Sequence, residues 1–206
     1  MGFNYDESIR YGTAVSDDGL RLVGHESADG YWTDSVTRWE LTNFRPRNIS
    51  GDGAYAIGSS GDTAIRMLLS VSGSTNPEFL WLNGSADFSS QFGNVIYGES
   101  DGPNGSQPVR WAVDQGVEIL TDWERIYSVD ANGEVIVGLA KNGVPSVGKY
   151  GQSPLALQSL LTAAGVGLDG YSITSVEGIS ADGSIVAGLA TKQSKTAVFL
   201  SRLPRL

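Results

Sequence analysis

The sequence predicts an all-β protein, a five-bladed, β-propeller-like ring of antiparallel repeats of about 40 residues each. The first observation is a phrase with two glycines five residues apart, which occurs five times with mostly apolar residues between the glycines. The second is a basic residue before a large one, found after each of the first four copies. The third is the composition, with 27 glycines in 206 residues and 18% charged residues, which fits short strands and tight turns. The five phrases end at Gly24, Gly58, Gly98, Gly138 and Gly188.

The glycine phrase predicts a hairpin in each repeat. An Asp or Asn precedes the opening glycine in four copies, as in Asp18-Gly19 and Asn132-Gly133. Between apolar runs, such pairs favour a type I′ turn, in which both central residues have positive φ. The first strand of each repeat therefore ends before this pair, and the second strand runs through the closing glycine.

The basic-large pair predicts the third strand of each repeat, with the large side chain pointing into the core. Fourth strands are expected at 79–84 and 116–123. One such sheet cannot cover both of its faces, so repeats of this kind must stack or close, and radial closure gives a propeller. The third-strand pairs are Arg38-Trp39, Arg66-Met67, Arg110-Trp111 and Lys149-Tyr150, with Phe199-Leu200 in the fifth copy.

One short helix interrupts the fourth repeat. Residues 155–165 carry Leu and Ala at helical spacing and end in Gly165, a residue typical of helix C-termini. We expect a single domain over residues 1–206, because no linker or shift in composition divides the chain. Residues 1–10 are expected to supply an outer strand that closes the ring. The predicted repeats span 11–44, 45–84, 85–123, 124–171 and 172–206.

Composition excludes several classes of function. The net charge of −9 argues against binding to a nucleic-acid backbone, which needs clustered Lys and Arg. The chain has no cysteine, so disulfides and thiolate metal sites are impossible. The N-terminal residues do not read as a signal peptide, and no apolar run approaches the roughly 20 residues of a membrane span.

Residues 179–188 read I-S-x-D-G-x-x-V-x-G, and in other repeats Arg and Trp follow such a phrase after a loop. This pattern resembles the HAF-repeat family of probable extracellular repeats. The resemblance covers nearly the whole chain, and repeat three departs from it because Phe92 replaces the Asp. It implies a bacterial surface or autotransporter passenger protein, and we extend the expectation to phage virion proteins. The family is defined by its repeat structure, so the resemblance brings no catalytic residues.

No motif in the sequence selects a catalytic site. The turn aspartates Asp18, Asp52, Asp130 and Asp182 recur once per repeat, which favours backbone hydrogen bonding in turns over catalysis or calcium binding. His25 is the only histidine and is expected to be solvated. We therefore predict no enzymatic activity, no catalytic residues, no cofactor and no metal. A glycan-active hydrolase stays open as an alternative, because the 23 acidic residues could supply a carboxylate pair.

Four aromatic residues outside the repeat pattern are the candidate ligand-binding residues. Tyr31 and Trp32 fall in the loop after the first hairpin, Trp123 follows a predicted fourth strand, and Tyr171 follows the predicted helix. Aromatic side chains in polar loops can form apolar platforms for sugars or partner proteins. The alternative is that each of them packs on its own repeat.

We expect a non-enzymatic structural or binding module on a virion surface, as a phage decoration, tail or receptor-binding protein. Such a module presents a multivalent surface to proteins or glycans, where weak contacts add through effective concentration. A bacterial cell-surface or extracellular adhesion module is the alternative. The expected partners are other virion or surface proteins and glycans, with self-association left open, and without nucleic acid.

Overall fold

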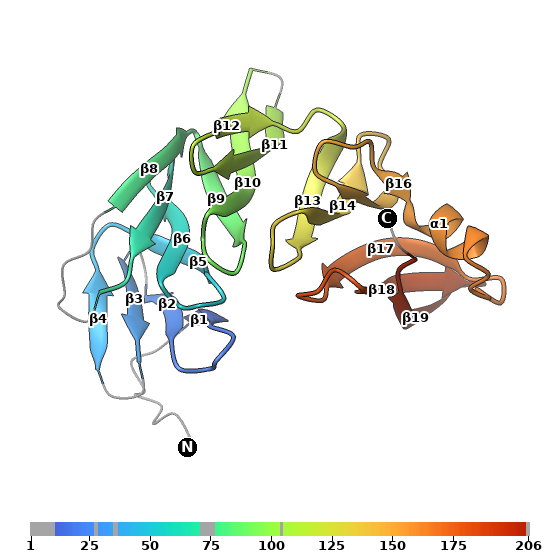
Figure 1. Ribbon diagram of the computed structural model, residues 1–206, viewed down its shortest axis with the longest axis horizontal. Coiled ribbons are helices and arrows are strands. Elements are labelled where there is room, and N and C mark those ends of the chain that lie inside the picture. Colours follow the sequence, from blue (N-terminus) through green and yellow to red (C-terminus); the bar gives the residue numbers. More distant parts are fainter. Residues whose placement is uncertain (1–10, 27–28, 35–36, 71–76, 104, 205–206) are drawn as a thin grey trace. The chain divides into compact units, whose positions relative to one another are not determined.

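A computed structural model describes residues 11–26, 29–34, 37–70, 77–103 and 105–204. Within this part the chain is all-β with one short helix, and its strands form five antiparallel sheets (Figure 1). The chain divides into two compact units, Met1–Glu118 and Ile119–Leu206. The closing strand predicted at residues 1–10 lies outside the described residues.

The first unit contains three four-stranded sheets, each with its strands in sequence order. Sheets 1 and 2 fall within the predicted repeats 11–44 and 45–84, and sheet 3 begins at Gly84, one residue before the predicted 85–123. Sheet 1 consists of β1 (Tyr11–Val15), β2 (Leu22–Glu26), β3 (Asp29–Thr33) and β4 (Arg38–Leu41). Sheet 2 consists of β5 (Arg45–Ile49), β6 (Tyr55–Ser60), β7 (Thr63–Leu68) and β8 (Pro77–Leu82). Sheet 3 consists of β9 (Gly84–Ser89), β10 (Val95–Gly102), β11 (Gly105–Ala112) and β12 (Gly116–Ile119).

The second unit contains sheets 4 and 5 and the helix. The helix α1 (Leu157–Ala163) is shorter than the predicted 155–165, because Leu155 and Ala156 pair as a strand. Gly165 follows its C-cap Ala164, has φ +79° and donates its N–H to the Thr162 carbonyl at 3.0 Å. Sheet 4 consists of β13 (Trp123–Val129), β14 (Val135–Ala140), β15 (Pro145–Lys149) and the two-residue β16 (Leu155–Ala156). Sheet 5 has three strands among the described residues, β17 (Ser172–Ile179), β18 (Ile185–Lys192) and β19 (Lys195–Arg202).

The turn at the opening glycine differs from the predicted type I′ turn. Gly19 has φ +69° and donates its N–H to the Ser16 carbonyl at 2.8 Å, while Asp18 does not have positive φ. The Ser16 hydroxyl donates to Asp18 Oδ1 at 2.6 Å, and the same carboxylate oxygen accepts the Leu20 N–H at 2.9 Å. The Ser and Asp side chains therefore hold a wider turn in which only the glycine is left-handed. The type I′ prediction was wrong for this reason.

The closing glycine of the phrase has a different role. A Cβ atom at Gly58 would overlap the carbonyl oxygen of Arg45, and one at Gly188 would overlap the carbonyl oxygen of Ser175. In both sheets the first strand makes a bulge near this point and brings its backbone onto the glycine. Close backbone approach, and not positive φ, requires glycine at the end of the phrase.

The predicted third strand of the first repeat was wrong. Tyr31 pairs with Gly24, as Ile65 pairs with Gly58 in sheet 2, so the third strand of sheet 1 is β3. Arg38 and Trp39, which the sequence placed on the third strand, begin β4 instead. The basic-aromatic pattern misled because sheet 1 has large aromatics on both strands, and the Trp32 and Trp39 rings stack with centroids 4.0 Å apart.

Within each of the two units, a sheet packs on the next sheet in sequence through opposite faces. We define the forward face of a sheet as the face that carries the residue before the closing glycine and the residue that pairs with it on the third strand. The backward face is the opposite face of the same sheet. The forward face of sheet 1 (Val23, Trp32) packs on the backward face of sheet 2 (Ile49, Ala56, Met67). The forward faces of sheet 2 (Ile57, Ala64) and sheet 4 (Val137, Val147) pack on the backward faces of sheet 3 (Ile96, Val109) and sheet 5 (Val176, Val186).

Polar contacts between consecutive turns accompany this packing. The guanidinium of Arg66 donates to the carbonyl of the next opening glycine, Gly93, at 2.7 Å, and Arg21 does the same to Gly53 at 2.7 Å. The third-strand arginine Arg66 thus links its own sheet to the turn of the next one. In the second unit, the Ala131 N–H donates to the Ala181 carbonyl at 2.9 Å.

Candidate functional site

The structure does not place the predicted aromatic platforms in exposed loops. Tyr31 and Trp32 lie on β3 with 0% of their surface exposed, and Trp123 begins β13 with 3% exposed. The polar residues around Tyr31 and Trp32 suggested a loop, but the strand pairing and the stacked Trp39 draw both side chains into the core. The loop assignment was wrong for these three residues. Their side chains are packed in the core, in line with the alternative that each aromatic residue packs on its own repeat.

Tyr171 is the one predicted residue of this set that is partly exposed and outside a strand. The Lys192 ammonium lies 5.6 Å from the centre of its ring. The same ammonium donates to the Asp169 carbonyl at 2.5 Å, which fixes it over the tyrosine. A ligand that stacks on the ring face beside Lys192 would have to displace this lysine, and the binding role of Tyr171 stays a prediction.

The turn aspartates have the structural role that the sequence predicted. Hydrogen bonds from the Ser16 hydroxyl and the Leu20 N–H lower the pKa of Asp18. Equivalent bonds from Ser180 and Ser184 lower the pKa of Asp182 to about 2. Asp130 differs, because it lies three residues before the opening glycine, at the position that Ser16 has in sheet 1. Its carboxylate accepts hydrogen bonds from the N–H groups of Glu134 and Val135 at 2.7 and 2.9 Å.

His25 is a strand residue and not a solvated loop residue. It lies on β2, where burial and the nearby Arg45 charge lower its pKa. In the described part of the chain, no group of three or more His, Asp or Glu side chains is arranged to hold a metal ion.

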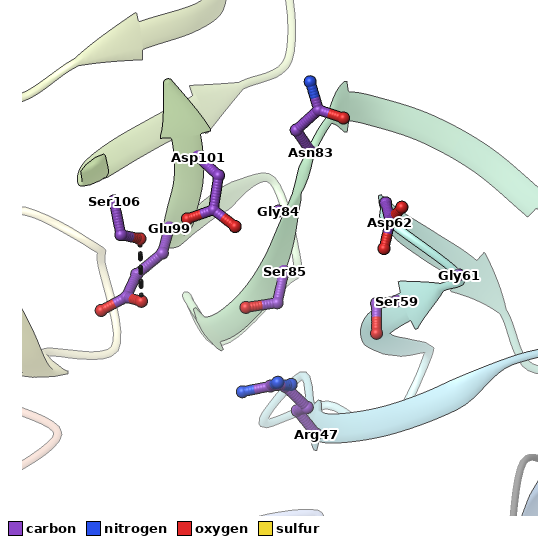
Figure 2. Close-up of a pocket in the computed structure, with 10 residues that line it drawn as sticks. All are labelled: Arg47, Ser59, Gly61, Asp62, Asn83, Gly84, Ser85, Glu99, Asp101 and Ser106. Atoms are coloured by element: carbon purple, nitrogen blue, oxygen red, sulfur yellow. Dashed lines mark hydrogen bonds between the residues drawn. The ribbon is translucent and has the colours of Figure 1, made fainter. Parts of the chain in front are cut away.

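A polar cleft between sheets 2 and 3 is the candidate site. Its volume is about 480 Å³, and it lies wholly in the first unit. Figure 2 shows side chains entering it from both sheets. The lining residues are Arg47, Ser59, Gly61, Asp62, Asn83, Gly84, Ser85, Glu99, Asp101 and Ser106.

The backbone at the junction of β8 and β9 builds the floor of this cleft. Gly84 donates its N–H to the Asp62 carbonyl at 2.9 Å, and Asp101 donates its N–H to the Asn83 carbonyl at 2.5 Å. A Cβ atom at Gly84 would overlap the Glu99 carbonyl oxygen. The Trp81 indole N–H also donates to that carbonyl at 2.9 Å, from beneath. These contacts fix the strands that carry the carboxylates.

Arg47 supplies the cationic side chain of the cleft. Its Nη1 lies 2.9 Å from Asp87 Oδ1, and half of its side chain is exposed. Burial raises the pKa of Asp87, while the Arg47 charge and the Ser85 hydroxyl, which donates to the carboxylate at 3.1 Å, oppose that shift. The ion pair anchors Arg47 at the side of the cleft that faces sheet 3.

Three carboxylates line the cleft and give it an excess of negative charge over Arg47. Asp62 and Asp101 lie on opposite sides, and Glu99 accepts a hydrogen bond from the Ser106 hydroxyl at 3.2 Å (Figure 2). The lining contains no aromatic ring and no histidine among the described residues. Carboxylates, hydroxyls and an amide can together bind a hydroxylated or cationic ligand through hydrogen bonds.

The sequence analysis missed this cleft, although a signal was present. The polar residues come directly after the closing glycines, as Ser59 to Asp62 after Gly58 and Glu99 to Asp101 after Gly98. Equivalent turns of consecutive repeats lie next to each other, so carboxylates at this offset in neighbouring repeats predict a shared acidic site.

Comparisons with solved structures support the fold. The chain is similar to putative TolB from Agrobacterium tumefaciens, with a TM-score of 0.60 and 14% identity over 93% of this chain and 76% of that one. It is also similar to TolB from Acinetobacter baumannii (TM-score 0.56, 15% identity, 93% of this chain and 51% of that one). The β-propeller domain of the Trilobed protease from Pyrococcus furiosus gives 0.58 at 13% identity, over 91% of this chain and 66% of that one. No protein-family profile and no curated protein sequence matches the chain. The fold is therefore all-β with propeller-like neighbours.

No helix among the described residues is long and apolar enough to cross a membrane.

Proposed function

We propose that this protein is a non-enzymatic binding module that holds a neutral or amine-bearing glycan in the cleft between sheets 2 and 3. The cleft itself carries this proposal, because its lining is polar and anchored by backbone hydrogen bonds. Sugar hydroxyls and amines donate to carboxylates such as Asp62 and Asp101, and serine hydroxyls can donate to or accept from a sugar. The excess of negative charge disfavours sulfated, phosphorylated or sialylated glycans.

The five sheets are proposed to act as five blades of one propeller-like module. The setting we propose is a virion surface, as a decoration, tail or receptor-binding protein, with a bacterial cell surface as the alternative. The supporting observation is the HAF-like repeat phrase, which spans nearly the whole chain. Immunogold labelling of purified particles and of the host-cell surface with an antibody against this chain would separate the two settings.

The binding proposal is tested on a glycan array with the wild-type chain and the double variant Asp62→Asn/Asp101→Asn. We expect the wild-type chain to retain a defined set of neutral or amine-bearing glycans and the variant to lose them. Asp114→Asn is the matched control, since Asp114 is an exposed turn aspartate outside the cleft. Equal retention by wild type and double variant would place binding elsewhere, and no retention by wild type would reject glycan binding.

A glycan-active hydrolase is the second candidate, because several carboxylates share one cleft. Glycoside hydrolysis needs two carboxylates on either side of the scissile bond. Incubation of each retained glycan with the wild-type chain, followed by mass spectrometry, would distinguish the two functions. Intact glycans support the binding module, and shortened glycans that disappear with Glu99→Gln would replace it by the hydrolase.

A further inference from the structure

The turn between α1 and β17 contains an Asp-Gly pair, Asp169-Gly170. Across this turn the Tyr171 N–H donates to the Leu168 carbonyl at 2.8 Å. Asp169 and Gly170 have φ +48° and +77°, so both central residues are left-handed, as in a type I′ turn. The left-handed region is unfavourable for a residue with a Cβ, and Asp169 is therefore the strained residue of this turn.

Lys192 on β18 contacts the peptide bond between Asp169 and Gly170. Its ammonium donates to the Asp169 carbonyl at 2.5 Å, and its Cε and Nζ lie 3.5 and 3.6 Å from a Cβ built on Gly170. A cationic donor on a carbonyl oxygen withdraws electrons from the carbonyl carbon and from the amide nitrogen bonded to it. The Asp169 carbonyl carbon is therefore more open to attack, and the Gly170 nitrogen loses its proton more readily. All of these contacts lie within the second unit.

The Asp-Gly pairs of the repeat turns have their reactive groups occupied. In sheet 1 the Gly19 N–H donates to the Ser16 carbonyl at 2.8 Å, and the Asp18 carboxylate accepts hydrogen bonds from a hydroxyl and a backbone N–H. The turns of sheets 2 and 5 repeat these bonds. Neither an acceptor for the Gly170 N–H nor a donor to the Asp169 carboxylate is present among the described residues. Only at this pair are the nitrogen and the carboxyl group both left to react with each other.

We propose that Asp169-Gly170 is a site of isoaspartate formation and that Lys192 promotes the reaction. The Gly170 nitrogen attacks Cγ of the protonated Asp169 carboxyl group, and the carboxyl hydroxyl leaves with the N–H proton as water. The product is a succinimide with a new bond between this nitrogen and Cγ. Water then adds to the Asp169 α-carbonyl carbon, and the bond from that carbon to the Gly170 nitrogen breaks. The backbone now runs through Cγ, and the former carbonyl is a free carboxylate. The water lost in the first step is regained in the second, so the reaction needs no other reagent.

The position of Lys192 also selects the product of succinimide hydrolysis. Attack of water at the α-carbonyl gives isoaspartate, whereas attack at Cγ regenerates aspartate. The Lys192 ammonium lies on the α-carbonyl oxygen, so it activates the carbon whose hydrolysis gives isoaspartate. The same ammonium then pairs with the carboxylate that forms there, which stabilises the isoaspartate product.

The test is peptide mapping of the full chain after long incubation at neutral pH in water enriched in heavy oxygen. Each hydrolysed succinimide takes up one heavy oxygen, and electron-transfer fragmentation separates isoaspartate from aspartate. In the wild-type chain we expect labelled isoaspartate at position 169 to form about tenfold faster than at the other Asp-Gly pairs. Those pairs lie in repeat turns or in strands and begin at Asp18, Asp29, Asp52, Asp101 and Asp182.

The role of the lysine is tested with Lys192→Met, which keeps the length of the side chain and removes its charge and its donor. We expect labelling at position 169 to slow about tenfold, since a hydrogen bond to a charged group is lost, and the share of isoaspartate in the labelled product to fall. Lys195→Met is the matched control, because Lys195 pairs with Lys192 across the β18–β19 turn, and both values should match those of the wild-type chain. Labelling at position 169 no faster than at the other pairs would overturn the site. An unchanged rate and product ratio in a folded Lys192→Met chain would overturn the role of the lysine.

Discussion

Sheet 1 and sheet 5 are built from the same repeat, but their forward faces have opposite surroundings. Trp32 is fully buried under the next sheet, while Leu200, at the same position of the last sheet, is 74% exposed. The pairing of strands and the turn at the opening glycine are alike in the two sheets. The repeat therefore builds each sheet by itself, whereas burial of the forward face depends on the presence of a following sheet.

The largest expected difference comes from truncating the two equivalent side chains. Trp32→Ala should lower the free energy of unfolding by about 3–5 kcal/mol, because it removes a buried ring that packs on Trp39 and sheet 2. Leu200→Ala should change it by less than about 0.5 kcal/mol in the dilute monomer. Urea unfolding followed by circular dichroism measures both. Similar losses for the two variants would show that the forward face of sheet 5 is covered within one chain.

The closing glycines should show no such difference between sheets. Gly58→Ala in sheet 2 and Gly188→Ala in sheet 5 each push a Cβ into a carbonyl oxygen of the first strand. We expect each to cost about 2–4 kcal/mol, since the neighbouring backbone must shift. The same urea unfolding measures both, with Gly178→Ala as a control, because a Cβ there meets no atom within 4 Å and its φ is not positive. A loss confined to one sheet would contradict a shared hairpin geometry.

The opening glycines of sheets 1 and 2 should differ in their sensitivity to substitution. Gly19 and Gly53 have φ +69° and +71°, so alanine costs about 1–2 kcal/mol at either site through backbone strain. Gly53→Ala should cost about 1 kcal/mol more, because its Cβ meets Ser16 and Arg21 of sheet 1. Melting temperatures of the two variants in dilute solution give the comparison. A Gly19→Ala variant that is as destabilised as Gly53→Ala would contradict the open space found around Gly19.

The smallest effect is expected from acid titration of the sheet 5 turn. The pKa of Asp182 falls to about 2 in the folded chain from an ordinary value of 3.8, because Ser180 and Ser184 donate to the carboxylate. Its stabilisation is therefore complete above pH 3.8 and is lost as the pH falls towards 2. Asp182→Asn should flatten the pH dependence of the urea midpoint over this range. An unaltered slope in Asp182→Asn would reject this account.

Much of the fold follows from local patterns that recur along the chain. The five glycine phrases predicted the hairpins, and the strands expected at 79–84 and 116–123 overlap β8 (Pro77–Leu82) and β12 (Gly116–Ile119). The helix lies inside its predicted range and ends at Ala163, two residues before Gly165. The type I′ turn was wrong because the Ser and Asp side chains bond the backbone of a wider turn. The third strand of sheet 1 was wrong because two aromatic strands lie next to each other.

The candidate site was harder to predict, because no single motif contains it. Arg47 and Asp62 come from sheet 2, and Glu99 and Asp101 come from sheet 3, so the cleft exists only when two repeats pack. The predicted aromatic residues Tyr31, Trp32 and Trp123 had the right chemistry for a platform, but pairing of their strands buries them. Exposure is a property of packing, and the sequence pattern did not contain it.

The sequence by itself determined the repeat and where its turns and its helix fall, because these positions depend on backbone preferences and on hydrogen bonds within a few residues. Only the tertiary structure decided which faces pack on each other within each unit and which carboxylates share a cleft. Those properties depend on contacts between sheets that lie about 40 residues apart in sequence, and the same residue position is core or surface according to its neighbour.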